Sequence, residues 1–183
     1  MKVNGKHYRT IWADETNNGI IHIIDQRFLP HEFKVVQLQT SGQMCIAIKE
    51  MHVRGAGLLG AAAGYGMYLG ALEANESTFD HDIHAIATQI NSTRPTAVNI
   101  NWAVKRQLST IKKGKTKKEK VDIALQTAIA IADEDAMHCR QIGLHGLKLI
   151  TEIANAKPNS TVNILTHCNA GWLAFVDHGT ALS

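Results

Sequence analysis

The stretch TVNILTHCNAG, residues 161–171, carries more structural information than any other part of the chain. Its β-branched run predicts a buried strand that ends at Cys168, just before a turn of small residues. Ligands of open α/β sheets bind beyond the carboxyl ends of strands, so we expect chemistry at this thiol. Only twelve residues follow Gly171. We therefore expect the chain to hold only the first strand of an α/β domain.

The composition is that of a globular protein. Of 183 residues, 45% are hydrophobic and 19% are charged, which argues against disorder. The net charge is +3, but six lysines and one glutamate lie between Lys112 and Lys120, a local +5 that leaves −2 elsewhere. This lysine run has no interleaved aromatic residues and predicts a solvated loop between helices, so we expect no nucleic-acid partner.

The first part of the chain predicts a small antiparallel β element followed by helices. Strands are expected at 20–25, after the turn signal Asn17-Asn18-Gly19, and at 34–38. Five helices are expected. The first is opened by a capping box of Thr40 and Gln43 and runs to Met51, the second covers 55–73, and the third is opened by a capping box of Ser77 and Asp80. The fourth begins at Pro95, and the fifth covers 121–153 with a bend near Gly143 and Gly146.

These elements predict a fold between the α+β and α/β classes. It would comprise a small N-terminal antiparallel β element, a bundle of about five helices, and the first strand of a truncated Rossmann-like parallel-sheet domain. We place the boundary at Lys157-Pro158, which gives an N-terminal β and helical domain over 1–157 and the start of a second domain over 158–183.

Residues 55–72 are uncharged, at the lower limit of length for a membrane span. Six of the 18 residues are glycine, which makes the segment weakly hydrophobic. We predict a tightly packed internal helix, in which Gly60 and Gly64 let another backbone approach, and no membrane association.

The three cysteines are an odd number without the spacing of a disulfide framework, and no secretory leader precedes them, so we expect a reducing cytoplasm. Cys45 and Cys139 are predicted to be core residues, whereas Cys168 is either reactive or a buried, inert thiol. Histidines lack a third ligand at a definable spacing, so no metal is expected. The acidic triplet at 133–135 either orients a basic partner or faces water.

Arg54 and Arg94 each lie directly before a predicted helix. A cation there faces the positive end of the helix dipole, at a cost of roughly 0.3–1 kcal/mol. A bound anion reverses that cost, since free N–H groups and a guanidinium together make a phosphate site. The alternative is that each arginine points away and pairs with an acid.

Three blocks resemble one family, methylthioribose-1-phosphate isomerase, within the larger group that includes ribose-1,5-bisphosphate isomerase and regulatory subunits of initiation factor 2B. The blocks are VRGAGLLG with AAAGYG at 53–66, STRPTAVN at 92–99, and LTHCNAG at 165–171 continuing to GTAL at 179–182. They keep the family's order and approximate spacing over nearly the whole chain.

The resemblance implies an aldose–ketose isomerase of methionine salvage, which converts 5-methylthioribose 1-phosphate to 5-methylthioribulose 1-phosphate without a cofactor. It implies that Arg54, Gly55, Ala56 and Arg94 bind the phosphorylated pentose and that Cys168 acts at its C1 and C2 carbons. The alternatives are ribose-1,5-bisphosphate isomerase and a non-catalytic, initiation-factor-2B-like regulatory or scaffold subunit that binds sugar phosphates.

Two departures from the family pattern matter. Gly57 stands where the family usually has proline, which makes that loop less preorganised. The family's catalytic aspartate lies beyond the end of this chain, so we expect the chain alone to be nearly inactive. Either the chain is part of a longer protein that forms a homo-oligomer, namely a dimer, or a separate chain supplies the C-terminal half.

Overall fold

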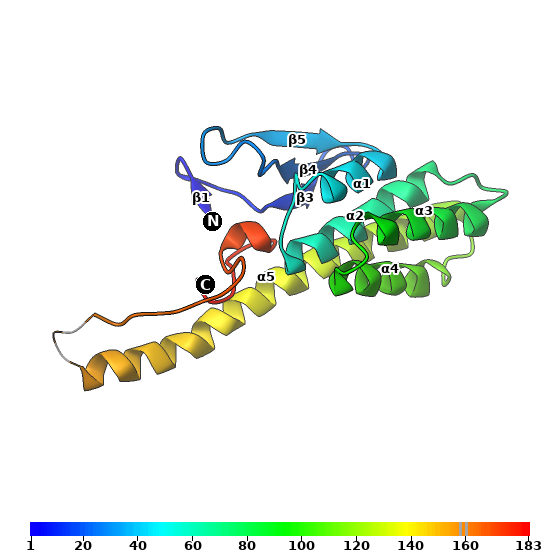
Figure 1. The fold of residues 1–183 in the computed structure, drawn as a ribbon. Coiled ribbons are helices and arrows are strands. Elements are labelled where there is room, and N and C mark those ends of the chain that lie inside the picture. The colour runs from blue at the N-terminus through cyan, green and yellow to red at the C-terminus, as the bar shows by residue number, and fades with distance from the viewer. Residues whose placement is uncertain (158, 160) are drawn as a thin grey trace.

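The computed structural model describes residues 1–157, 159 and 161–183. A β-hairpin and a three-stranded sheet precede five helices, and a return segment follows the last helix (Figure 1). The elements are β1 (Lys2–Val3), β2 (Lys6–His7), β3 (Ile11–Ala13), β4 (Ile21–Ile24), β5 (Val35–Leu38), α1 (Ser41–Lys49), α2 (Ala56–Glu73), α3 (Phe79–Thr93), α4 (Val98–Ile111), α5 (Lys117–Ala156) and the 3-10 helix η1 (Trp172–Ala174).

The three-stranded sheet is antiparallel, in the order β3-β4-β5, and β1 pairs with β2 separately. The register of the three-stranded sheet places Ile11 opposite Ile23 and Ile21 opposite Leu38. All four side chains are buried in the core, because alternate residues of a strand point to the same face. The two strands predicted at 20–25 and 34–38 are confirmed as β4 and β5.

Helix α2 is the centre of the molecule, and the other four helices pack around it. A side chain at Gly60 would contact Asn99 of α4, and one at Gly64 would contact Ile131 of α5. The predicted close approach at both glycines is confirmed, and the missing charges of 55–72 are explained by burial. Among the described residues, no helix combines the length and apolar character that crossing a bilayer requires.

The predicted cap of α1 is confirmed, because Thr40 Oγ1 accepts a hydrogen bond from the Gln43 N–H at 3.0 Å. The prediction of a capping box at Ser77 and Asp80 is wrong. Thr78 is the N-cap of α3 and its side chain makes no capping bond. Asp82 instead takes up the donors of this turn, accepting from the Asn75 N–H at 2.9 Å and the Thr78 hydroxyl at 2.8 Å.

Helix α4 begins at Val98, three residues later than the predicted start at Pro95. The Ala97 N–H donates to Arg94 O at 3.0 Å, which closes a turn around Pro95 and Thr96 before the helix starts. Proline at the second position of a turn has the same backbone angle as proline at the first position of a helix, so the sequence signal does not separate them.

Helix α5 is longer than predicted and runs without interruption for 40 residues, through Gly143 and Gly146. Thr116 and Glu119 form a full capping box at its start. The lysine run thus ends α4 and opens α5, as predicted for a break between helices.

The buried strand predicted to end at Cys168 does not form in the described part of the chain. Residues 161–167 are extended and run back along α5, with Leu165 99% exposed (Figure 1). A strand needs a neighbour for its N–H and C=O groups, and no described strand lies beside this segment. The antiparallel and helical parts of the predicted fold class are confirmed. Pro158 and Ser160, at the predicted boundary, lie outside the described residues, and the division into 1–157 and 158–183 stays a prediction.

Candidate functional site

The N-terminus of α2 faces a cavity and is not capped by any side chain of the described residues. Its first intrahelical bond runs from the Leu59 N–H to Gly55 O, so the amides of the first turn have no carbonyl partner within the helix. Gly55 has φ of +103°, and a Cβ there would overlap Ala174. Glycine is therefore required both for the backbone angle and for the contact with η1.

The cavity has a volume of about 470 Å³ and is lined by all five residues predicted to form the site. They are contributed by three separate parts of the chain, namely the start of α2 with the loop before it, the turn before α4 and the segment after α5. The residues are Arg54, Gly55, Ala56, Arg94 and Cys168. The structure thus brings the predicted residues together, while their individual roles stay predictions.

Among the described residues, neither arginine has a carboxylate within ion-pair distance. The alternative in which each arginine pairs with an acid is therefore not what the chain adopts. Arg94 needs a correction, however, because it is the C-cap of α3 and lies four residues before α4. A cation is favourable at that end of a helix, so the argument from an adverse dipole applies to Arg54 alone.

Cys168 is exposed, whereas Cys45 and Cys139 are buried. Burial raises the pKa of both buried thiols to about 11, so they are inert core residues, as predicted. Cys168 has φ of +65°, an uncommon angle for a residue with a side chain. Such angles cluster at functional sites. The expectation of a buried Cys168 is wrong, while its reactivity stays a prediction.

The segment after Cys168 folds back on itself and onto the body of the protein. The Thr180 N–H donates to Ala170 O at 2.9 Å, and Gly171 and Gly179 form an isolated antiparallel bridge. The Thr10 N–H donates to Val176 O at 3.0 Å, which ties the loop to the end of the N-terminal sheet. These bonds fix one end of the extended segment that carries Cys168.

The acidic triplet at 133–135 is divided among three partners. Asp133 pairs with Arg9 on the surface, and Glu134 accepts two hydrogen bonds from Arg106, which lower its pKa. Asp135 accepts from the Val176 N–H, and burial raises its pKa. The other oxygen of Asp135 occupies the space that a Cβ at residue 57 would need, so a residue larger than glycine would overlap this carboxylate.

Sequence reasoning missed two amide side chains that also line the cavity, Asn99 and Asn169. Asn99 Nδ2 donates to Ala56 O at 2.8 Å and so joins α4 to the first turn of α2. The signal was available, since Asn99 ends the block 92–99 and Asn169 directly follows Cys168. In the described part of the chain, no three His, Cys, Asp or Glu side chains are grouped as a metal site would require.

Residues 52–180 match the model of the initiation factor 2 subunit family. This range contains every residue that lines the cavity except Met51. The chain belongs to this family.

Two curated relatives match this chain over nearly all of its residues. It is 45% identical over 184 residues to "Methylthioribose-1-phosphate isomerase" of Desulfatibacillum aliphaticivorans, covering 99% of this chain and 49% of the relative. It is 47% identical over 184 residues to the protein of the same name from Escherichia coli O45:K1, covering 100% of this chain and 48% of the relative. The chain thus spans about half the length of the curated relatives it matches.

Two solved structures are similar to the chain. Translation initiation factor eIF-2B subunit delta from A. fulgidus has a TM-score of 0.81 and 35% identity, over 96% of this chain and 49% of that one. The 5-methylthioribose 1-phosphate isomerase from Pyrococcus horikoshii OT3 has a TM-score of 0.79 and 36% identity, over 95% of this chain and 47% of that one. Both confirm the arrangement of small sheets and five helices.

Proposed function

We propose that this chain provides the sugar-phosphate half of an aldose–ketose isomerase that acts on 5-methylthioribose 1-phosphate. The observation that carries the proposal is the single cavity shared by Arg54, Arg94, the N-terminus of α2 and Cys168. The names of the curated relatives agree with this chemistry.

The phosphate group is assigned to the end of the cavity beside Ala56. Amide N–H groups at a helix N-terminus and guanidinium groups both favour a dianion, and charge-assisted hydrogen bonds of this kind contribute about 1.5–3 kcal/mol each. Glycine at position 55 keeps the backbone free of a Cβ there. The exposed thiol of Cys168 then lies on the same cavity as the bound sugar.

The reaction is an isomerisation and needs no external oxidant. The bond between C1 and the ring oxygen breaks, the hydrogen on C2 moves to C1, and the C2 hydroxyl becomes a carbonyl while its proton goes to the former ring oxygen. Cys168 is assigned to the reacting carbons, either as the base that takes the C2 proton or as a group that stabilises the transition state. Product made in D2O separates these routes, because proton abstraction allows deuterium to enter at C1 and a direct hydride shift does not.

A carboxylic acid is required beside Cys168 for the remaining proton transfer, and we assign it to a C-terminal half like the one that completes the longer relatives. That half would also pair with residues 161–166 and cover Leu165. We further propose that the complete protein works in the cytoplasm as a homodimer.

The test is turnover of 5-methylthioribose 1-phosphate by the protein expressed from its complete open reading frame. Cys168→Ser should lower kcat by about 10²- to 10⁴-fold, the usual contribution of a general acid or base. Arg94→Ala should weaken substrate binding by about tenfold or more, since a charged hydrogen bond is lost. Cys139→Ser is the matched control and should leave both values unchanged. Full turnover by the Cys168 variant would refute its assignment.

The second candidate is a regulatory subunit that binds sugar phosphates without converting them. The similarity to the solved initiation factor 2B subunit favours it. In that case the sugar phosphate would bind with wild-type affinity to the Cys168→Ser variant, and neither protein would form the ketose.

A further inference from the structure

Gln26 lies just after β4 and joins two segments that line the cavity of the candidate site. Its backbone N–H donates to His52 O at 2.9 Å, and its Nε2 donates to Leu173 O at 2.6 Å. His52 lies in the loop that leads to Arg54, and Leu173 lies in η1, in the segment that follows Cys168. One residue thus bonds to both segments through two separate groups.

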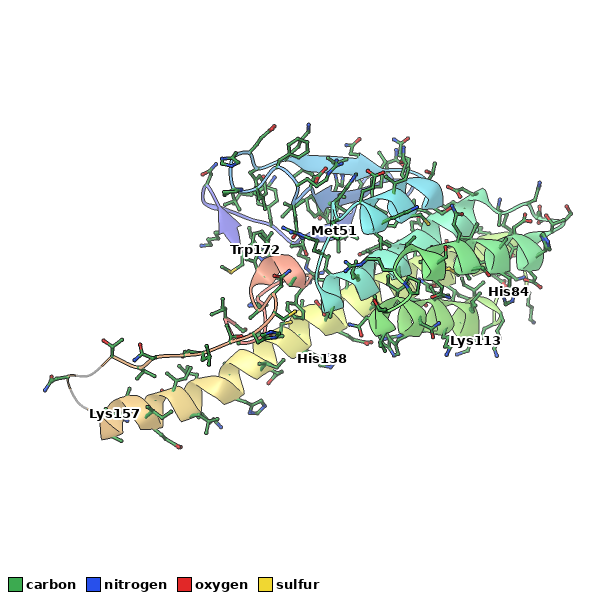
Figure 2. The ribbon with its side chains drawn as sticks, in the orientation of Figure 1. Met51, His84, Lys113, His138, Lys157 and Trp172 are labelled. Carbon is green, nitrogen blue, oxygen red and sulfur yellow. The ribbon has the colours of Figure 1, made fainter. Side chains whose placement is uncertain are left out.

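The same two segments contact each other directly. Gly55 lies against Ala174 of η1, so closely that a Cβ at residue 55 would overlap it. Trp172, the first residue of η1, is labelled in Figure 2. The spacing between Arg54 and Cys168 therefore depends on how η1 is seated against the start of α2.

The backbone around Gln26 is fixed by its neighbours. Gln26 is only 4% exposed, and Asp25 is fully buried. The Asp25 carboxylate accepts hydrogen bonds from the Arg27 N–H at 3.1 Å, Nε at 3.0 Å and Nη2 at 2.7 Å, which closes a turn around Gln26. Burial alone would raise the pKa of Asp25, but the hydrogen bonds from Arg27 hold it below its ordinary value, so the carboxylate stays charged. The Gln26 amide is therefore held in place before any ligand binds.

The two segments differ in how many other anchors they have. The loop before α2 is also tied to the end of α1, because the N–H groups of His52 and Val53 donate to Ala47 O at 2.9 and 3.3 Å. For residues 168–174, the bond from Gln26 is the only hydrogen bond to the sheets or to α1–α5 among the described residues. Loss of the Gln26 amide should therefore loosen η1 and leave the loop in place.

We propose that Gln26 is a positioning residue of the isomerase, which holds the Cys168 thiol at a fixed place relative to a phosphate bound beside Arg54. The inference rests on the proposed function, because it concerns how the two parts of that site are held together. A displacement of about 1 Å at a reacting group is enough to lower a rate by about 10²-fold. Binding of the phosphate, which depends on the separately anchored loop, should change little.

The experiment compares Gln26→Met with the wild type, both expressed from the complete open reading frame. Methionine is close to glutamine in size and keeps the backbone N–H that donates to His52 O, but its side chain has no donor for Leu173 O. The kcat for 5-methylthioribose 1-phosphate should fall by about 10- to 100-fold, while KM should stay within about twofold. Gln26→Asn, whose amide is one methylene too short, should show the same split and replaces the methionine variant if that protein does not fold.

Gln107→Met is the matched control. Gln107 is also a buried glutamine whose Nε2 donates to backbone carbonyls, those of Gly64 and Ala124 at 2.9 Å each, but it does not line the cavity. Both methionine variants should lower the midpoint of urea unfolding. Only Gln26→Met should lower kcat.

A second measurement needs no turnover. Inorganic phosphate should slow the reaction of iodoacetamide with Cys168 in the wild type, because the thiol lies on the same cavity as the bound anion. In Gln26→Met most of this protection should be lost, since η1 no longer holds the thiol there. Intact-mass spectrometry of samples taken over time gives both rates.

The outcomes separate the positioning role from the proposed function. An unchanged kcat in the folded Gln26 variants, a loss confined to KM, or an equal fall of kcat in Gln107→Met would overturn the positioning role and leave the isomerase standing. If the wild type converts no sugar phosphate, the proposed function fails and the labelling rates decide. Protection that is lost in Gln26→Met then supports the positioning role, whereas protection that is kept there, or absent from the wild type, overturns it.

Discussion

The Asp135 carboxylate accepts a hydrogen bond from the Val176 N–H at 2.7 Å, and this bond joins the middle of α5 to the loop that follows Cys168. The same carboxylate lies against Gly57 in the first turn of α2. One side chain therefore holds the return segment against the helix whose N-terminus faces the cavity.

Asp135→Ala should destabilise the protein by about 1–3 kcal/mol, because a buried N–H loses its acceptor. Asp135→Asn keeps an acceptor oxygen and should cost less. Unfolding in urea, followed by circular dichroism, measures both changes, and faster hydrogen exchange at the Val176 amide should accompany the alanine variant.

The control is Asp133→Ala, which removes an exposed ion pair with Arg9 and should cost about 1 kcal/mol or less. Equal losses from the Asp133 and Asp135 variants would contradict the anchoring role of Asp135.

Gly55→Ala should destabilise the protein by at least about 1–3 kcal/mol from backbone strain alone, with the overlap against Ala174 in addition. Gly146→Ala is the matched control, and it should change the free energy of unfolding in the opposite direction. Gly146 lies inside α5 with nothing within 4 Å of an added Cβ, so alanine should stabilise by about 0.5–1 kcal/mol. Differential scanning calorimetry should show Tm falling for the first variant and rising for the second. A stable Gly55→Ala protein would argue against the requirement for glycine there.

Iodoacetamide near neutral pH should modify the folded protein once, at Cys168. Cys45 and Cys139 are buried and their thiols have pKa values of about 11, so almost no thiolate is available to react. Intact-mass spectrometry counts the adducts, and the Cys168→Ser variant should show none. Inorganic phosphate in the cavity should slow the labelling of Cys168. Two or three adducts on native protein would show that the core thiols are accessible.

Asp177 makes part of the stability depend on pH. Its Oδ2 lies 2.6 Å from His7 Nε2 and its Oδ1 lies 2.6 Å from the amino group of Met1. Burial alone would raise the pKa of this carboxyl, but its hydrogen bonds with Met1, His178 and His7 together hold the pKa below the ordinary value of 3.8. The stabilisation is therefore complete above pH 3.8 and is lost as the pH falls through the lower folded-state pKa.

Asp177→Asn should cost about 1–2 kcal/mol at neutral pH, allowing for the solvent exposure of its partners. The gap between variant and wild type should narrow as the pH is lowered below 3.8. Urea unfolding of both proteins at a series of pH values measures the gap. A gap that stays constant down to the lowest pH would exclude a charged Asp177 as its source.

The sequence predicted an element correctly where one local signal stands alone and failed where a second nearby group competes with it. Thr40 and Gln43 lie within one turn, and their cap was foreseen; the Asp82 carboxylate displaced the cap expected at Ser77 by reaching two donors outside its own helix. Pro95 has the same backbone angle in a turn as in a helix, so only the Ala97–Arg94 hydrogen bond separates the two.

The residues of the candidate site were foreseen from the three sequence blocks, but their environment was not. Arg94 was expected to face the start of α4 and instead ends α3. The junction at Gln26 was missed, because His52 and Leu173 lie far from it in the sequence and only tertiary packing brings them together. The strand expected to end at Cys168 was wrong because a strand with this apolar pattern needs a neighbouring strand, and the described residues supply none beside it.

Helix α2 carries five glycines between Gly57 and Gly70, each of which weakens an isolated helix by about 1 kcal/mol relative to alanine. Alone in water such a segment would be a coil, and it becomes helical only when its neighbours enclose it. The amides that face the cavity are consequently aligned only once the bundle has assembled. Nascent or partly folded chains should have no affinity for a phosphorylated sugar, so ligand recognition itself reports that the tertiary structure is complete.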